Sequence, residues 1–262
     1  MKLGLGFAMP NATDDNLRAA VQLGATHAFV NNADVGDGYF EFDQLLRLRH
    51  RFEHLGLHLE GLENFPRAWW EHVLVAGPRR DEQIDNICRS IDNMGRAGIR
   101  VLGYYFSIVS VWGHWRAYNA GGGRGGAGLK SFDYSKVEDA PIHPGGRVSV
   151  DEMWERLHYF LERVIPVAES ANVRLAAHQD DPPAEYLRGV GRLLTTHEAM
   201  QKLLDLVPSH HNGLEFCQGT VAEMDPRSTV EAVRRFAGQN KIVYVHFRNV
   251  RGAFPVFDEV FH

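Results

Sequence analysis

The sequence predicts an α/β protein of the (β/α)8 TIM-barrel type, and three observations support this fold class. Short apolar runs with strand character alternate with amphipathic helical segments along the whole chain. Strands separated by helices run parallel with right-handed crossovers, which leaves either a barrel or a doubly wound sheet. No GxGxxG or Walker-type loop follows the first strand, so the barrel is favoured.

The first four βα steps occupy residues 2–107. Thr13 or a neighbouring aspartate can cap the first helix, and Gly24 ends it. Strands are predicted at 2–7, 26–31, 57–64 and 99–107, and helices at 13–24, 42–56 and 79–98.

Residues 108–149 interrupt this alternation. The run NAGGGRGGAG (119–128) has too many glycines for a regular element, so we expect a long flexible loop inserted into a single domain over 1–262. Within it, VWGHW (111–115) offers Trp112 and His114 as side chains that close over a polyol substrate. The alternative is that Trp112 and Trp115 only pack the loop onto the barrel.

The remaining elements bring the number of predicted strands to seven. Helices are predicted at 150–171, 196–206 and 227–238, and strands at 173–178, 213–217 and 241–247. A closed barrel has eight strands, so this sequence contains the barrel without its last βα unit. Open strand edges predict self-association into a homo-oligomer such as a dimer.

Composition excludes several kinds of partner. A net charge of −5 and a pI near 6.3 provide no basic field for nucleic acid. Two cysteines are too few for a disulfide framework, and neither a signal peptide nor a membrane-spanning run is evident. We expect a cytoplasmic protein with no membrane partner.

Three potential metal ligands end three consecutive predicted strands: His178, Cys217 and His246. The carboxyl ends of parallel barrel strands meet on one face, where the chemistry of such barrels takes place. A thiolate with two imidazoles suits a divalent transition ion. Singly, the cysteine would be a small buried apolar residue and each histidine a hydrogen-bonded rim residue; their joint placement predicts a shared metal site.

Polar residues beside these strand ends are candidate substrate ligands. Arg248 can clamp a carboxylate and Asn249 follows it, whereas a solvated surface arginine is the alternative. Asp180 in HQDDPP can orient a ligand or bind a hydroxyl, and Asp181 more simply forms a turn. Weaker candidates at the ends of strands three and four are Glu63, Asn64 and Tyr105.

Several segments together resemble the mannonate dehydratase family: ENFPRAWW, GPRRDEQIDNI, NMGRAGI, FSIVSVWG, HQDDPP, NGLEFCQGT and VYVHFRNVRG. The resemblance runs from residue 2 to residue 261. It implies a xylose-isomerase-like barrel that converts D-mannonate to 2-keto-3-deoxygluconate in hexuronate (glucuronate) breakdown. It also implies a divalent ion, usually Mn²⁺, on His178, Cys217 and His246, although Fe²⁺, Co²⁺ or Zn²⁺ would suit the same donors.

The chain departs from the family pattern at two places. Gln179 stands where the family usually has proline, which we expect to alter loop stiffness more than chemistry. The family continues to an eighth strand with a Pro-Asp-His motif, which supplies an aspartate ligand and a histidine for proton transfer. The general base and acid are therefore expected beyond residue 262. The alternatives are a metal-dependent sugar isomerase or epimerase on the same barrel, and a truncated, non-catalytic remnant that binds metal or sugar acid.

Overall fold

The structure, a computed structural model, describes residues 2–117 and 124–262. The chain divides into two compact units. The first comprises Met1–Tyr104, Tyr159–Ala176 and Ser209–Asn212, and the second comprises Tyr105–His158, Ala177–Pro208 and Gly213–His262. The single-domain organisation expected from the sequence stays a prediction. Within the described residues, no helix combines the length and the apolar character needed to cross a bilayer.

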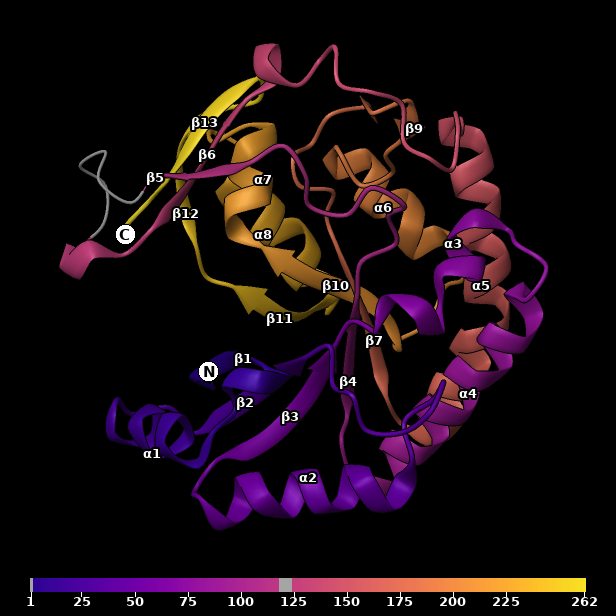
Figure 1. The fold of residues 1–262 in the computed structure, drawn as a ribbon, viewed down its shortest axis with the longest axis vertical. Coiled ribbons are helices and arrows are strands. Elements are labelled where there is room, and N and C mark those ends of the chain that lie inside the picture. Colours follow the sequence, from indigo (N-terminus) through magenta and orange to yellow (C-terminus); the bar gives the residue numbers. More distant parts are fainter. Residues whose placement is uncertain (1, 118–123) are drawn as a thin grey trace. The chain divides into compact units, whose positions relative to one another are not determined.

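The first unit contains the four predicted βα steps (Figure 1). Neighbouring strands pair in parallel, and Thr13 caps the first helix by accepting a hydrogen bond from the backbone N–H of Asn16. The strands are β1 Gly4–Ala8, β2 His27–Asn31, β3 His58–Glu63 and β4 Val101–Tyr104; the helices are α1 Asp14–Gln22, α2 Phe42–His54, α3 Glu71–Val75 and α4 Arg80–Ala97. The sequence predicted all of these except the short α3.

Three elements have residues in both units: α5 Val150–Ala171, β7 Arg174–His178 and β10 Asn212–Cys217. The strand order of the seven-stranded sheet is β1-β2-β3-β4-β7-β10-β11, with β11 at Ile242–His246. Each strand therefore pairs with the next one of the series along the chain, as in a βα barrel. The seven predicted strands are confirmed.

The second unit contains the remaining helices, α6 His197–Leu206, α7 Gln218–Met224 and α8 Thr229–Gly238. Helix α7 begins directly after Cys217, where the sequence suggested only a turn. A two-residue turn joins the short strands β8 Tyr186–Leu187 and β9 Val190–Gly191.

A second sheet corrects the expectation of an irregular loop at 108–149. Strands β5 Trp115–Ala117 and β6 Leu129–Asp133 join β12 Asn249–Ala253 and β13 Val256–Val260 in the order β12-β13-β6-β5 (Figure 1). This small antiparallel sheet buries an apolar cluster of Phe132, Ala222, Val250 and Phe257. β13, one of the two partners of β6, lies more than a hundred residues away along the chain, so local composition could not reveal the pairing. Residues 119–123 of the glycine run lie outside the described residues.

Candidate metal centre

The second unit brings together the three predicted ligands His178, Cys217 and His246. Each offers one donor atom, and the three atoms lie within 4.8 Å of one another. The residues end β7, β10 and β11, which places them at one edge of the sheet. Cys217 is paired directly opposite His246. A spacing of this order leaves room for one ion to contact all three donors.

A register shift determines which side chain lies opposite Cys217. Leu214 pairs with Ile242, but Glu215 pairs with Tyr244, so Val243 is an extra residue in β11. Such a bulge changes the alignment of all later residues in the strand. With an uninterrupted register, Cys217 would face Val245 instead of His246.

The sulfur of Cys217 is buried and surrounded by donors; the residue is 2% exposed. Its Sγ accepts hydrogen bonds from the hydroxyl of Thr220 at 3.1 Å and from the N–H of Thr220 at 3.5 Å. Burial raises the pKa of Cys217, but hydrogen bonds from His178 and His246 and the charge of Arg248 outweigh it and hold the pKa well below its usual value. The site therefore favours the thiolate, which is the form that binds metals.

The imidazole of His178 is oriented by a hydrogen bond to the adjacent backbone. Its Nδ1–H donates to the carbonyl of Gln179, which leaves Nε2 directed to the site. Burial lowers the pKa of His178, but the Glu215 carboxylate and the Cys217 sulfur raise it to about 9. An arriving metal ion must therefore displace a proton from this ring.

Glu215 is a member of the site that the sequence reasoning missed. It precedes Cys217 by two residues on β10, so both side chains point to the same face of the strand. Its Oε1 lies 2.9 Å from Nε2 of His246 and 3.9 Å from Nε2 of His178. The signal was available, because an acidic residue inside the buried run GLEFC needs a cationic partner or a metal.

Gln179 ties the ends of two strands together. Its side-chain amide donates to the carbonyl of Glu215 at 3.0 Å, and its Oε1 accepts from the N–H of Cys217 at 2.9 Å. The side chain is fully buried, so these hydrogen bonds are shielded from water. Gln179 thus fixes the backbone on both sides of Phe216, beyond the loop stiffness that the sequence suggested.

Arg248 lies at the centre of a buried ionic network. Its Nη2 donates to the Glu223 carboxylate, to Oδ2 of Asp181 at 3.2 Å and to the hydroxyl of Thr220 at 3.2 Å. Its buried Nη1 has no hydrogen-bond partner among the described residues. Gly219 makes room for the side chain, since a Cβ there would approach Nε of Arg248 to 2.4 Å.

The pKa of the Glu223 carboxyl is shifted in the opposite direction to that of Asp181. Burial and the neighbouring Asp181 raise its pKa well above the usual value, and Arg248 only partly opposes them. Burial also raises the pKa of Asp181, but His114 and Arg248 outweigh it and bring the pKa below its ordinary range. The two acids around Arg248 are therefore electrostatically distinct.

Asp180 and Tyr105 are held by contacts within the protein. Oδ2 of Asp180 accepts from the N–H groups of Leu193 and Leu194, each at 2.8 Å, and Oδ1 lies 3.0 Å from Nε of the fully buried Arg192. Arg192 also donates to the Tyr105 hydroxyl at 2.6 Å. These contacts support the loop after His178, and substrate binding by Asp180 and Tyr105 stays a prediction.

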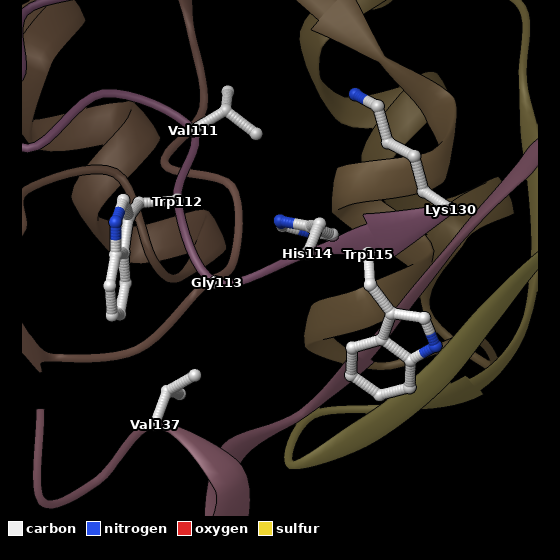
Figure 2. A pocket seen from close by; sticks show the side chains of 7 residues that line it. All are labelled: Val111, Trp112, Gly113, His114, Trp115, Lys130 and Val137. Atoms are coloured by element: carbon white, nitrogen blue, oxygen red, sulfur yellow. The ribbon is translucent and has the colours of Figure 1, made fainter. Parts of the chain in front are cut away.

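The other predicted substrate ligands belong to several different parts of the chain. Asn249 begins β12, and its side-chain oxygen accepts from the N–H of Val250 at 3.0 Å. Trp112 and His114 line a cavity of about 590 Å³ in the second unit (Figure 2). Asn64 belongs to the first unit, where it follows β3 with a positive φ of 60°.

The fold and site define a barrel-type α/β protein with a candidate divalent-metal centre at its strand ends. The chain belongs to the D-mannonate dehydratase (UxuA) family, whose model matches residues 16–145 and 142–262. The family resemblance seen in the sequence is thereby confirmed.

Individual relatives agree with this assignment. A mannonate dehydratase of Streptococcus pneumoniae is 32% identical over 256 residues, covering 89% of this chain and 69% of the relative. One from Thermotoga maritima is 28% identical over 241 residues, covering 80% of this chain and 66% of the relative.

Solved structures confirm the predicted fold class. The crystal structure of mannonate dehydratase from Streptococcus suis matches with a TM-score of 0.83 and 28% identity, covering 99% of this chain and 76% of that one. A D-psicose 3-epimerase from Clostridium cellulolyticum matches with a TM-score of 0.61 at 12% identity, covering 90% of this chain and 71% of that one, which shows the fold alone. The fold is that of the xylose-isomerase-like TIM barrels.

Proposed function

We propose that this protein is a metal-dependent hydro-lyase that converts D-mannonate to 2-keto-3-deoxy-D-gluconate in hexuronate catabolism. The observation that carries the proposal is the cluster of His178, Cys217 and His246 in a member of the D-mannonate dehydratase family. The names of the relatives support dehydration over epimerisation.

The donor set fits a divalent transition ion, and we propose Mn²⁺, with Fe²⁺, Co²⁺ or Zn²⁺ as other candidates for the same donors. His178, Cys217 and His246 would hold it, and the Glu215 carboxylate beside both imidazoles adds compensating charge. When bound, the ion supplies Lewis-acid polarisation that makes the C2 proton of the sugar acid more acidic.

Arg248 would bind the substrate carboxylate. Nη2 is already committed to Glu223, Asp181 and Thr220, so the guanidinium plane is fixed before substrate arrives. Nη1 makes no hydrogen bond among the described residues and lies 3.8 Å from Oε1 of Glu259, so it is the group that can donate to a substrate carboxylate oxygen. Substrate hydroxyls would be bound by Asn249, Trp112 and His114 in the second unit, with Asp180 and Tyr105 holding the loop after His178. Substrate binding by Asn64 stays a prediction from the sequence.

A cytoplasmic location and a homo-oligomeric state belong to the same proposal. Both cysteines are free thiols, which suits a reducing compartment. Val245 on β11 and Phe247 just after it are 47% and 71% exposed, an apolar surface that favours association with another copy.

The proposal is tested by incubating the chain with Mn²⁺ and D-mannonate and measuring the 2-keto acid as its semicarbazone. We expect turnover that is lost, together with bound metal, in Cys217→Ser but retained in Cys88→Ser, the matched cysteine control. A product that retains every hydroxyl would indicate an epimerase. Bound metal and sugar acid without any product would indicate the non-catalytic alternative.

A further inference from the structure

A cavity in the second unit is lined by aromatic, apolar and cationic side chains. Its volume of about 590 Å³ lies within the range of roughly 300–1,000 Å³ that is usual for small-molecule sites. In Figure 2, Trp112, Lys130 and Trp115 lie on different sides of the His114 ring. Among the lining residues, Trp115 and Val111 are 38% and 42% exposed, so a small molecule can reach the cavity from solvent.

The cavity does not share its lining residues with the candidate metal centre. Neither Arg248 nor any of the three proposed metal ligands lines it. On the side of Asp181 the wall is His114, whose side chain is 7% exposed and whose Nε2 lies 3.0 Å from Oδ1 of Asp181. The ring of His114 also packs against Phe132, with a centroid distance of 5.1 Å. A molecule in the cavity is therefore contacted by a different set of side chains from one bound at the metal centre.

Lys130 gives the cavity a positive charge that the protein does not neutralise. Its backbone N–H donates to Oε2 of Glu259 at 3.0 Å, which holds the residue in β6. Among residues 2–117 and 124–262, its ammonium group forms no ion pair with a carboxylate. A lysine ammonium is a compact point charge with three hydrogen-bond donors on a flexible stem. Lys130 is therefore able to bind an anionic group of a molecule in the cavity.

Two further cations lie on the indole rings of the cavity. Nζ of Lys136 is 4.1 Å from the ring centroid of Trp115. Cζ of Arg188 is 5.0 Å from the ring centroid of Trp112. Asp133, at 3.8 Å from Nζ of Lys136, balances part of this charge. Together with the ammonium group in the lining, these side chains give the cavity a positive field that attracts anions.

We propose that this cavity is a second binding site, which takes a small organic carboxylate with its charged group on Lys130 and its carbon skeleton against Trp112 and Trp115. Indole rings offer rigid apolar surfaces to C–H groups, and a charge-assisted hydrogen bond fixes the carboxylate end. D-mannonate belongs to this class of ligand, and its choice is the one point at which the inference rests on the proposed function. The inference goes beyond catalysis, because a molecule held by Lys130 needs neither Arg248 nor a metal ion.

The test is a tryptophan-fluorescence titration of the full chain, without added metal, with D-mannonate and with the uncharged polyol D-mannitol. We expect D-mannonate to change the emission and D-mannitol to leave it unchanged at the same concentration. Lys130→Met removes the ammonium group and should weaken D-mannonate binding by about 10-fold or more. Lys202→Met is the matched control, because Lys202 also lies on an indole, 4.2 Å from the ring centroid of Trp154, and does not line the cavity. The response should shrink in Trp115→Phe and persist in Trp154→Phe.

Several outcomes would overturn the inference. D-mannitol acting as well as D-mannonate on the wild-type chain, or equal affinities in wild type and Lys130→Met, would exclude a carboxylate site. Inorganic phosphate binding as tightly as D-mannonate would exclude a role for the indoles. The response should persist in Cys217→Ser, and its loss there would show that the acid reaches the indoles only from the metal centre. A chain that never forms the 2-keto acid refutes the proposed function, whereas the titration decides the second site by itself.

Discussion

The hydroxyl of Thr220 donates a hydrogen bond to the sulfur of Cys217 across 3.1 Å, from the first turn of the helix that Cys217 caps. This bond favours the thiolate. Thr220→Val keeps the shape and removes the donor, so we expect an affinity for Mn²⁺ or Co²⁺ that is weaker by about 10-fold. Calorimetry and the thiolate charge-transfer band of the Co²⁺ form measure the change. An unchanged affinity would show that this contact does not influence the metal site.

Glu223 pairs with Arg248 where both are shielded from water. Glu223→Ala leaves the guanidinium with one fewer buried hydrogen-bond acceptor and creates a cavity, so the free energy of unfolding should fall by about 3 kcal/mol. Glu223→Gln retains an acceptor oxygen and should cost less. Urea denaturation of the two variants measures the difference, and equal losses would mean that the charge of Glu223, not the packing of its side chain, dominates at this position.

Gly219 is required by the position of Arg248. A methyl group at this position would come within 2.4 Å of Nε, so Gly219→Ala should displace the guanidinium from Asp181 and Glu223 and destabilise the fold by about 1–3 kcal/mol. Gly238 at the end of α8 is the matched control, because a Cβ there meets nothing within 4 Å. Gly238→Ala should leave stability unchanged or raise it. Thermal unfolding of both variants is the measurement, and a harmless Gly219→Ala would contradict the account of Arg248.

Gln179 makes two buried hydrogen bonds to the backbone beside Cys217. Gln179→Ala leaves the carbonyl of Glu215 and the N–H of Cys217 without these partners, so we expect a loss of about 1–3 kcal/mol of stability. Metal affinity should fall as well, because the backbone that aims Cys217 is released. Gln201→Ala in α6 is the control: its side chain bonds Asp205 and Gln239 and no group of the metal site, so it should leave the metal affinity unchanged. Stability and metal affinity are measured on the same samples. A loss of stability with unchanged metal affinity would show that Gln179 supports the fold but does not position Cys217.

Cys88 gives a pH dependence whose sign can be derived. Burial and the charge of Asp85 raise its pKa from 9.0 to about 11. Between these values the unfolded chain has lost the thiol proton and the folded chain retains it, so the free energy of unfolding falls as pH rises. The contribution of Cys88 to the free energy of unfolding is fully present below pH 9 and is lost as the pH rises from 9 through 11. Unfolding curves of wild type should fall more steeply across this window than those of Cys88→Ser, and parallel curves would contradict the shift.

The strands of the seven-stranded sheet and the helices between them could be predicted from sequence because each produces a periodic apolar pattern of its own. His178, Cys217 and His246 could be predicted as a group for a related reason, since residues at the ends of successive parallel strands meet at one edge. The boundaries of the long helices were also predicted closely, as in α4 and α6.

Other features depend on contacts that no local pattern encodes. The small sheet forms because β6 finds β13 far along the chain, and the extra residue Val243 is visible only once β10 and β11 are paired. Glu215 was missed because a single acid in an apolar strand is read first as an exception to the pattern. The roles of Gln179 and Asp181 depend on which backbone groups and rings their side chains reach in the folded chain.

The alternation of side chains along β10 makes the geometry of the site and the stability of the fold depend on the same strand register. Glu215 and Cys217 share one face of this strand, and Leu214 and Phe216 point to the other. A slip of one residue would send both apolar side chains to the reactive face and force a carboxylate and a thiol into the hydrocarbon interior. A misaligned chain would thus be both inactive and unstable, so partly correct molecules that bind metal in the wrong geometry would not accumulate.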